Sequence, residues 1–271
     1  MVFARLVEWG VLRVDLSGGE PTLRKDFAEI CKNAMECGLN VVVSTNGTVL
    51  PPDRLAQFPF VRWHVSLDSG FEQIHHESRL LRTLQPSNDT LRRTKEFIRA
   101  GLVLGLPIRV LTCVGRHNQD GLIELGEQLA TLGVREWNIS RILKAGRAQQ
   151  DYAEQWTPDE EYLRSQVRIM RSLYPLIRIR YSNRVDQEGY FLLVLPDGSL
   201  ATQFTDGRDK IRLGSVLELE PDDLRRSAHF SIEHHGLKWV SAFLANQPDE
   251  GFLFTPVLPQ KDLHSLSCSG D

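Results

Sequence analysis

The sequence is poor in cysteine, in long apolar runs and in net charge, and each shortage excludes a class of protein. Its 271 residues include only four cysteines at irregular spacing, which excludes a disulfide scaffold and is typical of a reducing cytoplasm. No apolar stretch reaches the roughly 18 residues of a membrane span, so we expect no membrane association. A formal net charge of -3 leaves no broad basic surface, so we expect no nucleic-acid partner.

What is present is the composition of a globular protein, with 41% hydrophobic and 25% charged residues. Along the first 140 residues, an amphipathic run that ends in glycine is repeatedly followed by a short apolar run. Glycine just past a helix adopts the left-handed conformation without steric cost, so the pattern predicts helices alternating with buried parallel strands. We place strands near 11–16, 40–44, 61–67, 107–114 and 136–142, and helices near 23–37, 89–101, 119–132 and 158–174.

The start of the chain fits this alternation incompletely. Val2 to Trp9 has the pattern of the last two turns of a helix that closes at Gly10. In a βα fold that helix should follow a strand, and no strand stands before it. We therefore expect the architecture to begin before Met1, although a genuine N-terminal helix is the alternative.

Beyond residue 144 the character of the sequence changes. Further strands are predicted at 177–181, 190–195 and 199–203, the last two joined by a turn at Pro196-Asp197-Gly198. The predicted fold class is α/β: a partial (β/α)6 TIM-type barrel that lacks its first strand, with a small α+β C-terminal extension. We expect the partial barrel over 1–150, the extension over 151–245 and a loose tail over 246–271.

Polar residues gather at the predicted carboxyl end of each parallel strand. In chain order these clusters are Ser17-Gly18-Gly19-Glu20-Pro21, Ser44 to Thr48, Ser66 to Ser69, Thr112 to Asn118 and Arg141 to Arg147. Barrel and open-sheet enzymes place their sites at this edge, so the clusters predict one binding rim. The two glycines let a ligand approach the backbone, and Glu20 suits a ligand ammonium. The alternative is that these loops are polar only because they lie at the surface.

Taken together, these strand-end motifs resemble the radical S-adenosylmethionine (radical SAM) superfamily across roughly residues 1–150. The resemblance lies in the order and spacing of the first three clusters, the segment Ile74 to Arg79, and Ile142 to Ala148. It implies that S-adenosylmethionine is the cofactor and that the residues matching the family's binding positions hold it. These are Ser17, Gly18, Gly19, Glu20, Pro21, Thr45, Asn46, Ser66, Asp68, Arg79 and Leu143. Within this set, the first loop is expected to hold the methionine moiety, Arg79 to meet its carboxylate and Leu143 to flank adenine.

The resemblance also implies an activity. In the family, a reduced 4Fe–4S cluster cleaves S-adenosylmethionine to a 5′-deoxyadenosyl radical, which abstracts hydrogen from a substrate. The nearest subgroup is that of cofactor and peptide maturases, so a peptide or cofactor precursor is the expected substrate and a reductant protein the expected partner. No catalytic residue is assigned.

One departure from the family concerns the cluster ligands. The family holds its cluster with a CxxxCxxC loop, and none of Cys31, Cys37, Cys113 and Cys268 supplies that spacing. We therefore assign no metal ligand within the chain and expect the cluster loop to precede Met1. Two alternatives stay open: a cluster-less, non-catalytic domain that binds an S-adenosylmethionine-like ligand or a partner protein, and a cluster-free barrel enzyme.

Overall fold

The computed structural model of the protein describes residues 1–9, 11–78, 89–142, 156–182, 192–202, 211–220 and 223. It divides into two compact units. Met1–Asp15, Ala28–Val41 and Val185–Asp271 form the first unit, and Leu16–Phe27 and Val42–Arg184 form the second. The expected domain boundaries after residues 150 and 245, and the expected tail, lie outside the described residues and stay predictions.

A six-stranded sheet is the framework of the fold, with strand order β1-β2-β3-β4-β5-β6. The strands are β1 (Arg13–Leu16), β2 (Asn40–Thr45), β3 (Arg62–Ser66), β4 (Ile108–Val114), β5 (Glu136–Arg141) and β6 (Arg178–Ser182). The pairs from β2 to β6 are parallel, as expected for strands joined by helical crossovers. This arrangement confirms the predicted α/β class.

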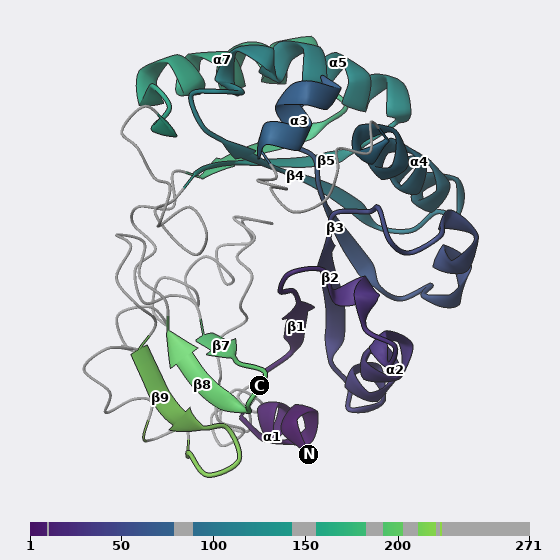
Figure 1. Ribbon diagram of the computed structural model, residues 1–271, viewed down its shortest axis with the longest axis vertical. Coiled ribbons are helices and arrows are strands. Elements are labelled where there is room, and N and C mark those ends of the chain that lie inside the picture. Colours follow the sequence, from purple (N-terminus) through teal and green to yellow (C-terminus); the bar gives the residue numbers. More distant parts are fainter. Residues whose placement is uncertain are drawn as a thin grey trace, which may run out of the picture. The chain divides into compact units, whose positions relative to one another are not determined.

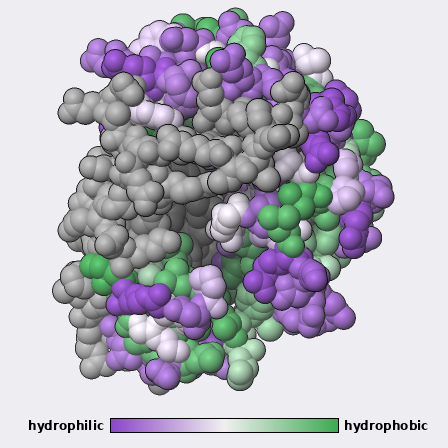
Figure 2. All heavy atoms as spheres, in the orientation of Figure 1, coloured by the Kyte–Doolittle hydropathy of each residue, from purple (hydrophilic) through white to green (hydrophobic). Residues whose placement is uncertain are grey.

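Helices connect the strands in the predicted order. They are α1 (Val2–Glu8), α2 (Phe27–Glu36), α3 (Glu72–Ser78), α4 (Thr90–Val103), α5 (Leu122–Leu132) and α7 (Glu160–Leu173), with short 3-10 turns at Pro21–Leu23, Pro52–Gln57 and Gln119–Gly121. In the second unit, α4, α5 and α7 lie on one side of the strands (Figure 1). Figure 2 shows largely hydrophilic side chains over α5 and α7 at the top of the view. No helix of the described segments is long and apolar enough to cross a bilayer.

Strand β6 corrects one expectation. The sequence assigns residues 177–181 to the C-terminal extension, but in the structure β6 pairs in parallel with β5 from Glu136↔Arg178 to Ser140↔Ser182. Helix α7 is tied to this strand because the Arg171 Nε donates to the Ile179 carbonyl at 3.0 Å. The strand ladder therefore makes residues 178–182 part of the main sheet.

The core of the second unit centres on the fully buried Trp63 of β3. Its ring packs edge-on against Phe58 and Phe97, with centroid distances of 5.8 and 5.3 Å, and Phe27 lies 6.3 Å away. Phe97 belongs to a buried stripe on α4 that also includes Leu91, Thr94, Ile98 and Gly101, at the spacing of one helix face.

Gly126 of α5 lies against the ring of Tyr174, and this contact predicts the effect of adding a methyl group. A Cβ at this position would come 2.4 Å from the Tyr174 ring, whose hydroxyl donates to the Ile123 carbonyl at 2.8 Å. Alanine gains about 1 kcal/mol of helix propensity, but displacing the anchored ring costs more. We expect Gly126→Ala to lower the free energy of unfolding by about 1–2 kcal/mol in urea titrations. The exposed Glu127→Ala should change it by less than about 0.5 kcal/mol, and a G126A protein as stable as wild type would contradict the expected clash.

The first unit contains an antiparallel sheet of β7 (Leu192–Val194), β8 (Ser199–Thr202) and β9 (Ile211–Ser215). The hairpin β7–β8 was predicted, and Gly198 at its turn has a φ of +78°. Hydrogen bonds from Ser199 and the guanidinium of Arg212, 2.6 Å away, hold the pKa of Asp197 well below its usual range. Strand β9 was not predicted, because Gly214, with a φ of +143°, interrupts its alternation.

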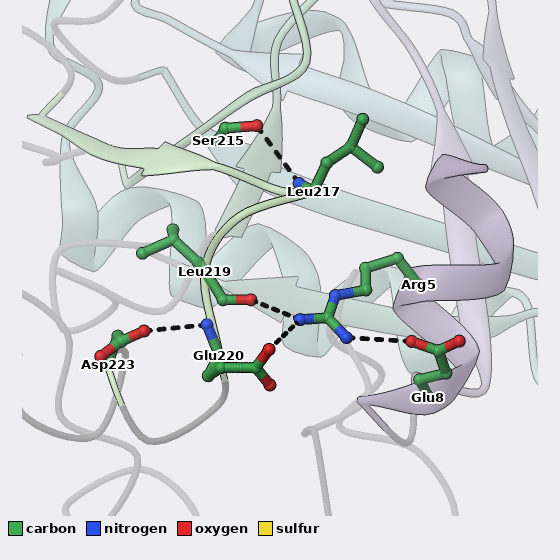
Figure 3. Close-up of polar contacts among 7 residues, drawn as sticks. All are labelled: Arg5, Glu8, Ser215, Leu217, Leu219, Glu220 and Asp223. Carbon is green, nitrogen blue, oxygen red and sulfur yellow. Dashed lines mark hydrogen bonds and ion pairs between the residues drawn. The ribbon is translucent and has the colours of Figure 1, made fainter.

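Helix α1 is confirmed and is tied to the segment that follows β9 by Arg5 (Figure 3). One Arg5 nitrogen donates to Glu8 at 3.0 Å, and the other donates to the Leu219 carbonyl at 2.9 Å and to the Glu220 carboxylate at 2.5 Å. This guanidinium therefore joins residues more than 200 positions apart in the sequence within the first unit.

Candidate functional site

The loop after β1 presents open backbone. Ser17, Gly18 and Gly19 are exposed. Gly18 has a φ of +144°, a conformation that favours glycine. A Cβ built on either glycine would meet no described atom within 4 Å. A ligand can therefore reach the peptide groups of this loop directly, as the sequence predicts.

Glu20 joins this loop to the loop after β2. Its Oε1 accepts hydrogen bonds from the Thr22 amide at 3.1 Å, the Thr22 hydroxyl at 2.5 Å and the Thr45 hydroxyl at 2.8 Å. Its Oε2 accepts one from the Asn46 amide at 2.8 Å. All four donors are neutral, so none of them compensates the negative charge of the carboxylate. Their hydrogen bonds occupy most of its lone pairs. Glu20 thus fixes the two loops relative to each other and contributes a negative charge between them.

The second loop is itself tightly held. The Asn46 Oδ1 accepts from the Thr48 amide and hydroxyl at 2.8 and 2.6 Å, and its carbonyl accepts from the buried Thr94 hydroxyl of α4 at 2.8 Å. Gly47 has a φ of +71°, and a Cβ there would press on Val65 and Phe97 at 3.3 Å. The Asn46 side-chain NH₂ has no partner within the described part of the chain, so it is a donor available to a ligand.

The end of β3 lies beside this loop, because the parallel register sets Thr45 opposite Val65. Ser66 is half-buried there. Asp68 is almost fully buried, and its Oδ1 accepts from the Cys113 amide at 2.8 Å. The structure therefore brings Glu20, Thr45, Asn46 and Ser66 to neighbouring strand ends, while the carboxylate of Asp68 ties β3 to β4.

Two residues that the sequence did not single out complete this edge. The Asn118 amide donates to the carbonyls of Asp68 and Cys113 at 2.8 and 3.0 Å, and its Oδ1 accepts from Gly115 at 2.9 Å. His117 Nε2 lies 2.8 Å from the Ser78 hydroxyl at the end of α3. Asn118 fell within the predicted polar cluster 112–118, but its bridging role depends on a tertiary contact. Arg79, which follows Ser78, and Leu143 lie outside the described residues.

The three described cysteines lie on or after α2 and on β4. Cys31 is buried on α2, Cys37 follows the end of that helix, and Cys113 is exposed on β4. Over the described segments, no three His, Cys, Asp or Glu residues are grouped to hold a metal ion. The sequence contains no CxxxCxxC spacing, so the spacing of its cysteines does not fit the family's cluster loop.

Cys31 should be the least reactive of the three described thiols. Burial raises its pKa to about 11. At pH 8 only about one Cys31 thiol in a thousand is therefore ionised, and the thiolate is the reactive form. We expect iodoacetamide to modify Cys113 at least about 100 times faster than Cys31, with the half-buried Cys37 as an intermediate control on the same stretch of chain, measured by peptide mass spectrometry. Equal rates for Cys31 and Cys113 would show that Cys31 is not buried in solution.

Comparison with known proteins identifies the family. A family model described as "Radical SAM superfamily" matches residues 1–129, the region that contains both loops joined by Glu20. The matched segment is therefore similar to the radical SAM superfamily. The resemblance predicted from the strand-end motifs is thereby confirmed, and this family implies S-adenosylmethionine and a 4Fe–4S cluster as cofactors.

Individual relatives agree with this assignment. The chain is 29% identical over 135 residues to an AdoMet-dependent heme synthase of Methanosarcina barkeri, covering 49% of the chain and 37% of that protein. It is 28% identical over 148 residues to a PqqA peptide cyclase of Bradyrhizobium diazoefficiens, covering 54% of the chain and 38% of that protein. The chain thus spans less than half the length of these curated relatives.

A solved structure shares the fold. The structure of anSMEcpe with bound AdoMet and the Cp18Cys peptide superposes with a TM-score of 0.62 at 14% identity, covering 88% of this chain and 74% of that one. At this identity the likeness concerns the fold alone, and it agrees with the six-stranded α/β architecture.

Proposed function

We propose that the strand-end loops of this chain bind S-adenosylmethionine as part of a radical SAM enzyme that modifies a peptide or a cofactor precursor. The observation that carries the proposal is the set of four hydrogen bonds that Glu20 accepts. Two come from Thr22 beside it, and the two from Thr45 and Asn46 join the first loop to the second. These bonds lie inside the segment that the family model matches. They hold two loops in a fixed relation, which a preformed ligand site requires.

The residues present fit the methionine part of S-adenosylmethionine. The exposed backbone of Ser17 to Gly19 offers carbonyl groups to an ammonium, and the charge of Glu20 favours a cation beside them. The Asn46 NH₂ and the Ser66 hydroxyl are donors for a carboxylate or ribose oxygen. Arg79 and Leu143 keep the roles that the resemblance implies. Asp68 keeps its predicted place in the site, and its Oδ1 also accepts from the Cys113 amide of β4.

When bound beside a reduced 4Fe–4S cluster, S-adenosylmethionine would supply a carbon-centred radical for hydrogen abstraction. The part of this chain is to orient the cofactor and to keep water from it, since its cysteines do not fit the cluster. The relatives that match it are named for heme synthesis and for peptide cyclisation, which supports a cofactor precursor or a peptide as the substrate class. A reductant protein is the implied electron-donating partner.

A second candidate function is a cluster-less domain that binds S-adenosylmethionine without catalysis. It is favoured by the cysteine positions 31, 37, 113 and 268, none of which reproduces a CxxxCxxC loop. Both candidates require the same binding site, and only the first requires turnover.

Equilibrium dialysis of the full chain against labelled S-adenosylmethionine tests the shared site. We expect saturable binding of one molecule per chain, and no saturable binding up to millimolar ligand would overturn both candidates. Anaerobic reconstitution with iron and sulfide, followed by reduction and assay for 5′-deoxyadenosine, then separates them. Production of 5′-deoxyadenosine supports the enzyme, and binding without production supports the non-catalytic domain.

A further inference from the structure

The sheet of the second unit has a face turned away from its helices. Trp63 of β3 packs on Phe97 of α4. Ile108 of β4 faces the same helix, because a Cβ added to Gly101 of α4 would touch its side chain. Because side chains alternate along a strand, Arg62 and Arg109 point to the opposite face. On β5, Trp137 donates to the helix-side Thr112, so Glu136 also points away from the helices.

Two guanidinium groups share one carboxylate on this face. The register of the three adjacent strands brings Arg62, Arg109 and Glu136 together near the strand starts. Arg109 binds the Glu136 carboxylate through Nε at 2.7 Å and Nη2 at 2.5 Å, and Arg62 reaches the same oxygen at 3.3 Å. Within this trio, two positive charges and one negative charge leave one net positive charge. Arg178 and Arg180 of β6 lie on the same face, because the register sets Arg178 opposite Glu136.

The two arginines differ in what they offer a solute. The side chain of Arg109 is 5% exposed and is held by two bonds to Glu136, whereas that of Arg62 is 39% exposed and has a single, longer contact. Burial lowers the pKa of the Arg109 guanidinium, Glu136 opposes that effect, and Arg180 and Arg62 add to it. Arginine nevertheless stays protonated, so like charges face one another here. An anion beside Arg62 would relieve this repulsion.

We propose that Arg62, backed by the Arg109–Glu136 pair, binds a small anionic group of the substrate, a carboxylate or a phosphate. The inference rests on the proposed function, because it takes this face of the sheet as the place of the substrate. A guanidinium fork matches both anions in geometry. Arg62 opens β3 and Ser66 closes it, so the anionic group lies about 13 Å along the strand from the proposed S-adenosylmethionine site. The substrate is then an elongated molecule with its anionic group remote from the reacting end.

The test measures the thermal unfolding midpoint of the full chain in increasing glutarate and, separately, inorganic phosphate. Sodium chloride keeps the ionic strength constant. We expect at least one anion to raise the midpoint of wild type at millimolar concentration. Arg62→Gln should raise the half-saturating concentration at least about fivefold, because a charge-assisted hydrogen bond is lost. Arg62→Lys keeps the positive charge but loses the two-pronged guanidinium. Its half-saturating concentration should lie between those of wild type and R62Q.

Arg92→Gln is the matched control, since Arg92 forms exposed ion pairs on α4 and should respond as wild type does. The anion whose effect is lost in R62Q identifies the group, either carboxylate or phosphate. An unchanged response in R62Q, or a wild type that responds to neither anion beyond sodium chloride, would overturn the proposal. This readout involves no S-adenosylmethionine. The anion test and the dialysis test can therefore fail separately, and each failure is recognised by itself.

Discussion

Replacing Glu20 by alanine is expected to weaken S-adenosylmethionine binding by about 30-fold or more, which corresponds to roughly 2 kcal/mol. The substitution removes the only acceptor that joins the first loop to the Thr45 hydroxyl and the Asn46 amide in the described structure. Thr45 is 3% exposed, so its hydroxyl would lose a partner that water cannot readily replace. The negative charge proposed to attract the ammonium is lost as well. Equilibrium dialysis measures the change.

Two variants make this result interpretable. Glu20→Gln keeps one carbonyl acceptor but replaces the other oxygen by a donor that cannot accept from Asn46, so its affinity should lie between those of wild type and E20A. Glu29→Ala removes an exposed carboxylate from α2 and should bind as wild type does. If E20A bound S-adenosylmethionine with wild-type affinity, Glu20 would have no part in the site.

Trp63→Ala is expected to lower the free energy of unfolding by about 3–5 kcal/mol, the largest loss that we anticipate for a single core residue. The indole is fully buried and makes ring contacts with Phe27, Phe58 and Phe97, so truncation leaves a cavity that several rings line. Urea titration followed by circular dichroism measures the loss.

Nearby aromatic substitutions provide the controls. Phe60, two residues before β3, is 81% exposed, so Phe60→Ala should change stability by less than about 0.5 kcal/mol. Trp63→Phe should cost less than the alanine variant, because the ring is partly kept and the indole N–H has no partner among the described residues. A W63A protein as stable as F60A would contradict the packing described for β3.

Local signals in the sequence predicted which helices and strands form better than they predicted where each one begins and ends. The glycine rule located the end of α5, where Gly133 has a φ of +84°. The helix expected from residue 23 begins only at Phe27, because the Glu20 carboxylate caps a 3-10 turn at Pro21–Leu23 and Arg24 is extended. Helix periodicity could not reveal this, since the cap comes from the preceding loop.

The sequence indicated candidate residues for the site but not the hydrogen bonds that connect them. The strand-end motifs indicated Glu20, Thr45 and Asn46, yet the bonds among them bridge loops about 25 residues apart and depend on β1 and β2 lying next to each other in the sheet. Thr94 was missed, although a polar residue in the apolar stripe of α4 is a signal for a buried hydrogen bond. Asp68 was predicted as a ligand contact, while its carboxylate is engaged by the backbone of β4.

Hydrogen–deuterium exchange with and without S-adenosylmethionine tests the central proposal most directly, because it reports where the ligand binds. Saturating ligand should slow exchange in peptides covering Ser17 to Thr22 and Ser44 to Thr48, the two loops that Glu20 joins. Helix α7, Glu160–Leu173, should be unaffected and serves as the internal reference. Protection in both loops is the predicted result. Unchanged exchange in both loops at a ligand concentration that saturates dialysis would contradict the proposed site.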